Sequence, residues 1–157
     1  MISITNFIHL TLNEKKMILT WRNNPTIQKV MHNKQKITLD EHINFIETLK
    51  ISDSKKYFLV KEGDTYIGVI DFINISNNHA ELGIYTNPNL KGYGKKLLNV
   101  LCSYAFDTML LTKLYAEVYI NNYKAIKLYQ HFNFKAITTD TNKGIYYMEL
   151  ANENWSI

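Results

Sequence analysis

The sequence contains little cysteine, proline or glycine: its 157 residues include one cysteine, two prolines and six glycines. The single cysteine, Cys102, excludes an internal disulfide, and a free thiol suits a reducing cytosol. No base is evident beside Cys102, so we expect a small core residue rather than a nucleophile. The chain shows no internal repeat, no linker and no low-complexity segment.

Long apolar runs and a basic leader are also missing. Residues 1–7 do not resemble a signal peptide, and no apolar run approaches the length that spans a bilayer. We therefore expect a cytoplasmic protein without a membrane partner. No spacing of His, Cys or Asp indicates a metal site, so we expect no metal.

Basic residues modestly outnumber acidic ones. The net charge is +4, which favours an anionic ligand without requiring nucleic acid. No run of five basic residues occurs, and basic and aromatic residues do not alternate along one stripe, so we expect no nucleic-acid partner. The length, with 46% hydrophobic and 20% charged residues, predicts one globular domain over residues 1–157.

Hydrophobic periodicity predicts alternating blocks of helix and strand. We expect strands at 2–9, 57–60, 66–75, 79–86, 113–119, 134–139 and 144–150, and helices at 12–22, from Pro25 through Met31, after Thr38, at 94–108 and at 122–132. A right-handed crossover through helix 94–108 would make strands 79–86 and 113–119 parallel neighbours. The fold class predicted is α/β (α+β), a mixed and mostly antiparallel sheet with helices on both faces.

The segment Lys91-Gly92-Tyr93-Gly94-Lys95-Lys96 is the most informative motif. It follows a strand-like run and precedes an apolar helix face. Backbone N–H groups of such a turn and the dipole of the helix start together favour a phosphate or pyrophosphate. The two glycines let a ligand approach the backbone closely. Glycine pairs also make ordinary tight turns, which is the structural alternative.

A second motif runs from Asn122 to Phe134. Its residues Ala125, Leu128 and Tyr129 have helical spacing, and Asn122 can cap the helix start. Asn133 stands where a left-handed residue ends a helix.

Together the two motifs resemble the GNAT superfamily of acetyl-CoA-dependent N-acetyltransferases. That family has a turn of the type Gln/Arg-x-x-Gly-x-Gly/Ala, then Asn-x-x-Ala-x-x-Leu-Tyr-x-x-x-Gly-Phe. Here Asn89 replaces the family's Gln/Arg, and Lys91 or Lys95 could substitute for it. The resemblance implies the GNAT fold and acetyl-CoA as co-substrate. The residues it implies for cofactor binding are Ile84, Asn89, Leu90, Lys91, Gly92, Tyr93, Gly94, Lys95, Lys96, Asn122, Lys127 and Tyr129.

Segments spread along nearly the whole chain resemble the N-acetyltransferases of pseudaminic acid biosynthesis. They are residues 21–25, 38–42, 55–60, 68–72 and 90–92. This resemblance implies acetylation of the 4-amino group of a UDP-linked 4-amino-4,6-dideoxy-N-acetyl-altrosamine. A Trp-Arg-Asn start also occurs in GNAT enzymes that acetylate protein N-termini, so a peptide or small-amine acceptor is the alternative. A non-catalytic CoA-binding module is a third reading.

The resemblance also implies roles in catalysis. It places the Tyr129 hydroxyl near the CoA sulfur as the acid, although spacing alone would fit a core tyrosine. Glu81 is the candidate base, acting through water, with a surface glutamate as the alternative. Tyr85 could orient that water or the amine, or simply pack in the sheet. Backbone N–H groups of Ile84 or Tyr85 could hold the thioester oxygen.

Acceptor recognition is expected at the junction of the first two helices. Trp21 could stack on a base or pack in the core, and Arg22 suits a diphosphate. Asn23 and Asn24 could bind sugar or uracil, or only make turns. His32 and His42 are expected at the surface or beside caps rather than in catalysis. The sequence is compatible with a homodimer but does not fix the oligomeric state.

Overall fold

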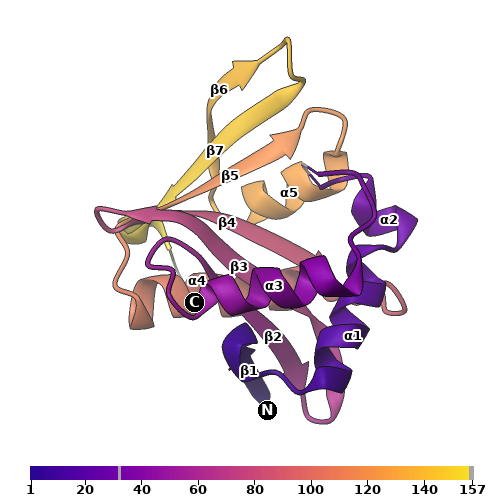
Figure 1. The fold of residues 1–157 in the computed structure, drawn as a ribbon. Helices are drawn as coiled ribbons and strands as arrows, with labels where there is room; N and C mark the ends of the chain where they lie inside the picture. Colours follow the sequence, from indigo (N-terminus) through magenta and orange to yellow (C-terminus); the bar gives the residue numbers. More distant parts are fainter. Residues whose placement is uncertain (32, 156–157) are drawn as a thin grey trace.

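A computed structural model describes residues 1–31 and 33–155. Its centre is one seven-stranded sheet in the order β1-β2-β3-β4-β5-β7-β6 (Figure 1). The strands are β1 (Ile2–Asn6), β2 (Lys56–Glu62), β3 (Thr65–Ser76), β4 (His79–Thr86), β5 (Lys113–Tyr119), β6 (Lys135–Asp140) and β7 (Ile145–Ala151). Every neighbouring pair is antiparallel except β4 and β5, which are parallel. The predicted mixed sheet and its parallel pair are confirmed.

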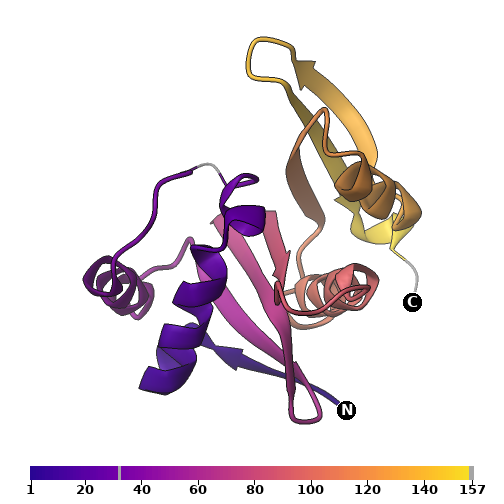
Figure 2. The same cartoon turned by 90° about the vertical axis from the view of Figure 1, so that its right-hand side faces the viewer.

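Helices cover both faces of the first four strands. They are α1 (Leu12–Arg22), α2 (Pro25–Gln28), α3 (Leu39–Leu49), α4 (Gly94–Ser103) and α5 (Tyr123–His131), and a π-helical turn, Tyr104–Thr108, continues α4. Figure 2 shows α1 and α3 on one side of this part of the sheet and α4 on the other. Helix α5 packs beside the C-terminal strands.

Local hydrogen bonds explain where the N-terminal elements begin and end. Thr38 and Glu41 form the predicted capping box, in which each side chain bonds the other residue's backbone N–H at 3.2 Å. The strand predicted at 2–9 is too long, because the Asn6 side chain accepts from Ile8 N–H at 3.1 Å and turns the chain into a 3₁₀ helix. Helix α2 is also shorter than predicted, and Met31 lies beyond its end.

Two hydrophobic cores fill the space on either side of the sheet. The core under α4 contains Leu97, Leu101 and Cys102, and the core under α1 and α3 contains Trp21. Cys102 is fully buried and burial raises the pKa of its thiol to about 12, which confirms the predicted core role. Trp21 is 3% exposed, so its packing is that of a core residue.

The sheet opens into a wedge between β4 and β5. These strands pair over three positions only, from His79 opposite Lys113 to Glu81 opposite Tyr115. Beyond Glu81 the strands diverge, and Figure 2 shows β5–β7 with α5 standing apart from β1–β4. One edge of β4 is therefore left without a neighbouring strand, which creates the position for the site.

Candidate active site

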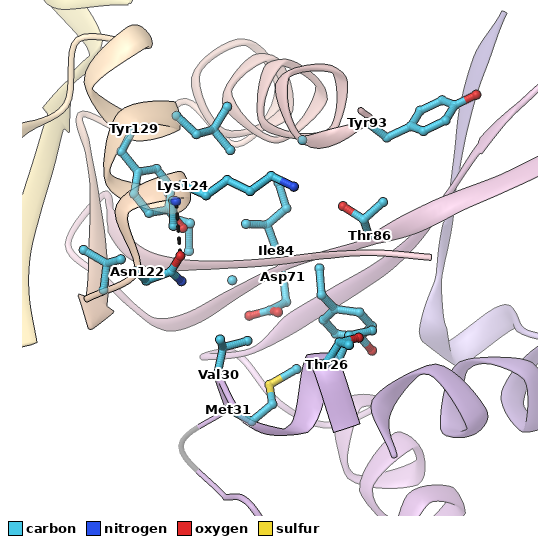
Figure 3. A pocket seen from close by; sticks show the side chains of 18 of the residues that line it. Thr26, Val30, Met31, Asp71, Ile84, Thr86, Tyr93, Asn122, Lys124 and Tyr129 are labelled. Atoms are coloured by element: carbon cyan, nitrogen blue, oxygen red, sulfur yellow. Dashed lines mark hydrogen bonds between the residues drawn. The ribbon is translucent and has the colours of Figure 1, made fainter. Parts of the chain in front are cut away.

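A cavity of about 660 Å³ occupies the wedge. Its walls come from α2 and the residues after it, from β3 and β4, from the turn before α4, and from β5 and α5 (Figure 3). Ten of the residues predicted for the site line it: Glu81, Ile84, Tyr85, Leu90, Lys91, Gly92, Tyr93, Gly94, Asn122 and Tyr129. Elements far apart in sequence thus meet around one space.

The glycine turn has the geometry of an anion site. Gly92 has a φ of +82°, a left-handed conformation that other residues rarely adopt, and a Cβ there would meet nothing within 4 Å. Helix α4 starts at Gly94 with Tyr93 in the N-cap position, and no side chain caps its first N–H groups. These free donors and the helix dipole can hold a phosphate group.

Helix α5 forms the wall opposite β4. Asn122 caps it, accepting from the Ala125 N–H at 3.3 Å, and Asn133 ends it with the predicted left-handed conformation, at a φ of 71°. A Cβ on Gly94 would lie 3.3 Å from Leu128 Cδ2, so the start of α4 approaches the middle of α5 closely. Both capping predictions are confirmed, and the caps set where α5 begins and ends.

Tyr129 lies at the inner end of the α5 wall. Its side chain is 6% exposed, with the ring centroid 5.3 Å from that of Phe134. Burial, followed by the charges of Asp71 and Cys102, raises the pKa of the Tyr129 phenol well above its ordinary value. The phenol is therefore protonated at neutral pH and can donate a hydrogen bond into the cavity.

Glu81 and Glu117 form a carboxyl pair at the apex of the wedge. Glu81 stands at the last paired position of β4, and Glu117 lies two residues beyond its partner Tyr115 on β5. Burial first, then the charge of Glu117 and the hydrogen bond between the two side chains, raises the pKa of Glu81 to about 7. When both carboxyls are ionised their charges repel, so the pair takes up one shared proton near neutral pH.

Tyr85 is partly buried, on the face of β4 that it shares with Glu81. Burial, then the charges of Asp71 and Tyr57, raises the pKa of its phenol far above the ordinary value. The phenol stays neutral and can only orient other groups through hydrogen bonds, so the predicted orienting role stays open.

Four predicted cofactor residues do not line the cavity. They are Asn89, Lys95, Lys96 and Lys127. Lys96 forms a salt bridge with Glu62 of β2, and the backbone N–H of Asn89 bonds the Asn87 side chain at 3.0 Å. Their contact with acetyl-CoA stays a prediction, and Lys91 is the lysine of the turn that reaches the cavity wall.

The predicted acceptor residues lie behind the cavity wall. Arg22 donates through Nη2 to the carbonyl of Asn33, and Asn23 bonds the backbone of Ile37 twice, at 2.8 and 2.9 Å. Asn24 caps α2, accepting from Thr26 N–H at 3.0 Å. These contacts, like the buried Trp21, hold the segment that follows α2 in place. Direct contact with an acceptor stays a prediction.

Several residues of the cavity wall were not predicted from the sequence. They include Thr26, Val30, Met31, Tyr57, Asp71, Glu117 and Lys124. Asp71 carried a signal, because it is a charged residue inside the apolar run 69–72. Glu117 carried none, since the alternate face of a half-buried strand is normally polar.

The two predictions for histidine have different outcomes. His42 is 5% exposed, and its Nε2 lies 3.0 Å from the carbonyl oxygen of Lys15, so of the two predicted places the surface is excluded. Its backbone N–H bonds the carbonyl of the helix cap Thr38 at 3.0 Å, so it lies beside a cap as the other reading predicted. It joins α3 to α1, which fits no catalytic role. His32 lies outside the described residues.

The described part of the chain offers neither a metal-binding cluster nor a membrane-spanning helix. Residues 1–31 and 33–155 contain no group of three or more His, Cys, Asp or Glu side chains placed to hold a metal ion. Within the same residues, none of the helices has the length and apolar character needed to cross a membrane.

Comparison with known proteins agrees with this geometry. Residues 17–134 match the model of the acetyltransferase (GNAT) family. The acetyltransferase PseH of Campylobacter jejuni is 43% identical over 154 residues, covering 98% of this chain and 96% of the relative.

Solved structures share the fold. The crystal structure of C. jejuni PseH in complex with acetyl coenzyme A matches with a TM-score of 0.82 and 38% identity, covering 96% of this chain and 99% of that one. Spermidine N-acetyltransferase from Vibrio cholerae, in complex with CoA and spermine, matches with a TM-score of 0.89 at 20% identity, over 98% of this chain and 96% of that one. The latter shows the fold alone.

These findings confirm the predicted fold class, the resemblance to the acetyltransferases of the pseudaminic acid pathway, and acetyl-CoA as co-substrate. The chain therefore belongs to the GNAT family of acetyltransferases, which transfer an acetyl group from acetyl-CoA to an amine.

Proposed function

We propose that this enzyme acetylates the 4-amino group of a UDP-linked 4-amino-4,6-dideoxy-N-acetyl-altrosamine, in the biosynthesis of pseudaminic acid. The observation that carries the proposal is the 43% identity to PseH over 98% of the chain. The cavity supports it, since it joins a phosphate-binding turn to a buried phenol and a carboxyl pair.

In the proposed reaction the acceptor amine attacks the thioester carbonyl of acetyl-CoA directly. Its nitrogen forms a bond to carbon, the C–S bond breaks, and the products are an amide and the free thiol of CoA. The acceptor must lose protons, and the departing thiolate must gain one. Acetyl-CoA would lie with its pyrophosphate on the turn at Gly92 and its thioester beside the open edge of β4.

The proposed proton acceptor is the carboxyl pair of Glu81 and Glu117. A pair whose pKa is raised to about 7 can take a proton from an ammonium group and release it to water at neutral pH. This extends the role predicted for Glu81 alone. The proposed donor to the thiolate is the hydroxyl of Tyr129, which stays protonated because its pKa is raised. Removing such a donor typically costs about 2–4 kcal/mol of transition-state stabilisation.

The acceptor would enter from the side of α2. Thr26, Val30 and Met31 line that side of the cavity, opposite α5 (Figure 3). Arg22 and Asn23 hold the segment after α2 against the rest of the protein, so they support this wall from behind. The proposed acceptor site is therefore adjacent to, and not on, the predicted Trp21–Asn24 segment.

Thiol release from acetyl-CoA tests the proposal. The enzyme is assayed with the UDP-4-amino-4,6-dideoxy sugar beside a panel of peptides and polyamines. Release with the sugar nucleotide at a kcat/KM at least about 100-fold above every other amine is expected, a difference of about 2.7 kcal/mol. Release only with peptides or polyamines would overturn the assignment and leave the acetyltransferase activity standing.

A further inference from the structure

Asp71 of β3 is a buried acid that the proposed proton transfers do not use. It lines the cavity and is only 8% exposed, yet no hydrogen bond or ion pair from the described residues reaches its carboxyl group. Buried polar groups in proteins nearly always have a partner, and an isolated carboxylate is costly. The carboxyl group of Asp71 therefore faces the cavity, where a bound group can supply the partner that residues 1–31 and 33–155 do not.

The sheet holds this carboxyl group in one place. Asp71 pairs with Tyr57 of β2 on one side and Gly83 of β4 on the other. A Cβ on Gly83 would lie only 2.3 and 2.5 Å from Asp71 Oδ2 and Oδ1. The carboxyl group thus lies directly over Gly83, and the glycine leaves the space that it occupies. Figure 3 shows it between Ile84 and the side chains of Val30 and Met31.

The groups around Asp71 favour a cation. Glu81 is the diagonal neighbour of Asp71 on the same face of the β3–β4 pair. The charge of Asp71 also helps to raise the phenol pKa of Tyr57, Tyr85 and Tyr129. Burial, followed by the charge of Glu81, raises the pKa of Asp71 to about 7. Arg22 acts on Tyr57 and Tyr85, but it is not among the groups that shift Asp71.

We propose that Asp71 binds the amino group of the acceptor. The ammonium nitrogen lies between Asp71 and Glu81 and donates a hydrogen bond to each carboxyl group. Asp71 fixes the direction of the nitrogen lone pair after proton loss, while the Glu81–Glu117 pair removes the proton. The inference rests on the proposed function for the identity of the acceptor, and it assigns Asp71 as the residue that recognises its amine.

Asp71→Asn tests this role because it keeps the size of the side chain and removes the charge. The measurements are the KM values for acceptor and acetyl-CoA, and calorimetric titration of the sugar nucleotide into enzyme saturated with CoA. We expect the acceptor KM and Kd to rise about 10-fold or more, equivalent to about 1.4 kcal/mol, with the KM for acetyl-CoA within about twofold of wild type. Asp64→Asn, in the exposed β2–β3 turn, is the matched control and should change neither.

A second pair of variants separates binding from folding. Gly83→Ala should displace the carboxyl group, raise the acceptor KM and lower the melting temperature, because its Cβ would overlap both oxygens. Adding Asp71→Ala to Gly83→Ala removes the overlap, so the melting temperature should recover while the acceptor KM stays high. A KM that recovers together with the melting temperature would overturn the inference and leave a packing role.

The two proposals fail in different ways. If wild type turns over the sugar nucleotide and Asp71→Asn binds it with unchanged affinity, the inference about Asp71 is wrong and the proposed function stands. If wild type acts only on another amine, the proposed function is wrong. The inference about Asp71 is then decided by whether Asp71→Asn raises the KM for that amine above the wild-type value. If wild type neither binds nor acetylates any amine tested, both are wrong.

Discussion

At the scale of single residues, the environment of Tyr129 decides what its hydroxyl can do. Its raised pKa rules out a phenolate at neutral pH and leaves a hydrogen-bond donor. Tyr129→Phe should lower kcat by about 10-fold or more, because the departing thiolate loses its donor. Acetyl-CoA affinity should be retained, since the ring remains. Steady-state kinetics and a binding titration check this, and an unchanged kcat would exclude the acid role.

The carboxyl pair predicts a dependence on pH. A base must be unprotonated to act, and the pKa of Glu81 is raised to about 7. For wild type, kcat/KM should therefore rise with pH up to about 7 and level off above it. Glu81→Gln removes the group whose pKa is raised to about 7, so the rising limb near that pH should be lost. The pH profile of kcat/KM with one acceptor, measured for both proteins, is the test, and superimposable profiles would contradict a role for the pair.

At the scale of elements, the glycine turn can be tested with a matched pair of variants. Gly92 and Gly63 both have left-handed φ values, +82° and +59°, and a Cβ at either would meet nothing within 4 Å. Valine should cost both positions about the same stability, on the order of 1–2 kcal/mol, through backbone strain. Only Gly92→Val should weaken acetyl-CoA binding, because its side chain enters the cavity.

Thermal melting and acetyl-CoA titration of the two variants decide this prediction. Equal acetyl-CoA affinity in Gly92→Val and Gly63→Val would mean that the turn does not bind the cofactor. Loss of affinity in both would point to a general effect of destabilisation.

Most elements could be predicted from the sequence because their signals are local. Thr38 with Glu41 marks a capping box, and Asn133 marks a left-handed helix end; both depend on neighbours within a few residues. The end of β1 was misjudged because the Asn6 side chain competes with the strand for a backbone donor.

The candidate site was only partly predictable because much of it depends on pairing between strands. The cofactor turn follows from its glycines, but the role of Asp71 depends on its position opposite Gly83 of another strand. The pairing of Glu81 with Glu117 likewise depends on the parallel register of β4 and β5. No single-strand pattern contains that information. Arg22 and Asn23 were predicted to bind the acceptor because they are polar, but their side chains bond the chain's own backbone.

At the scale of the whole molecule, the wedge makes cofactor binding and stability interdependent. The strands β4 and β5 pair at three positions and then separate, and the cavity between them is lined from both sides. A core that includes Leu97 of α4 and Leu114 of β5 joins the two halves below the wedge. A ligand that contacts both walls therefore adds a connection where the sheet has none.

Acetyl-CoA should accordingly stabilise the folded protein as a whole. At a free concentration of 100 times its Kd, a ligand that binds only the folded state adds about 2.7 kcal/mol. For a chain of this length that corresponds to a rise in melting temperature of about 5–10 °C. CoA should give a comparable rise at the same multiple of its own Kd, because the stabilisation depends only on the ratio of free concentration to Kd. A thermal melt at several concentrations measures this, with Gly92→Val as the comparison at equal ligand concentration. An equal rise in that variant would place the cofactor away from the glycine turn, whereas a smaller rise would tie the stabilisation to the start of α4.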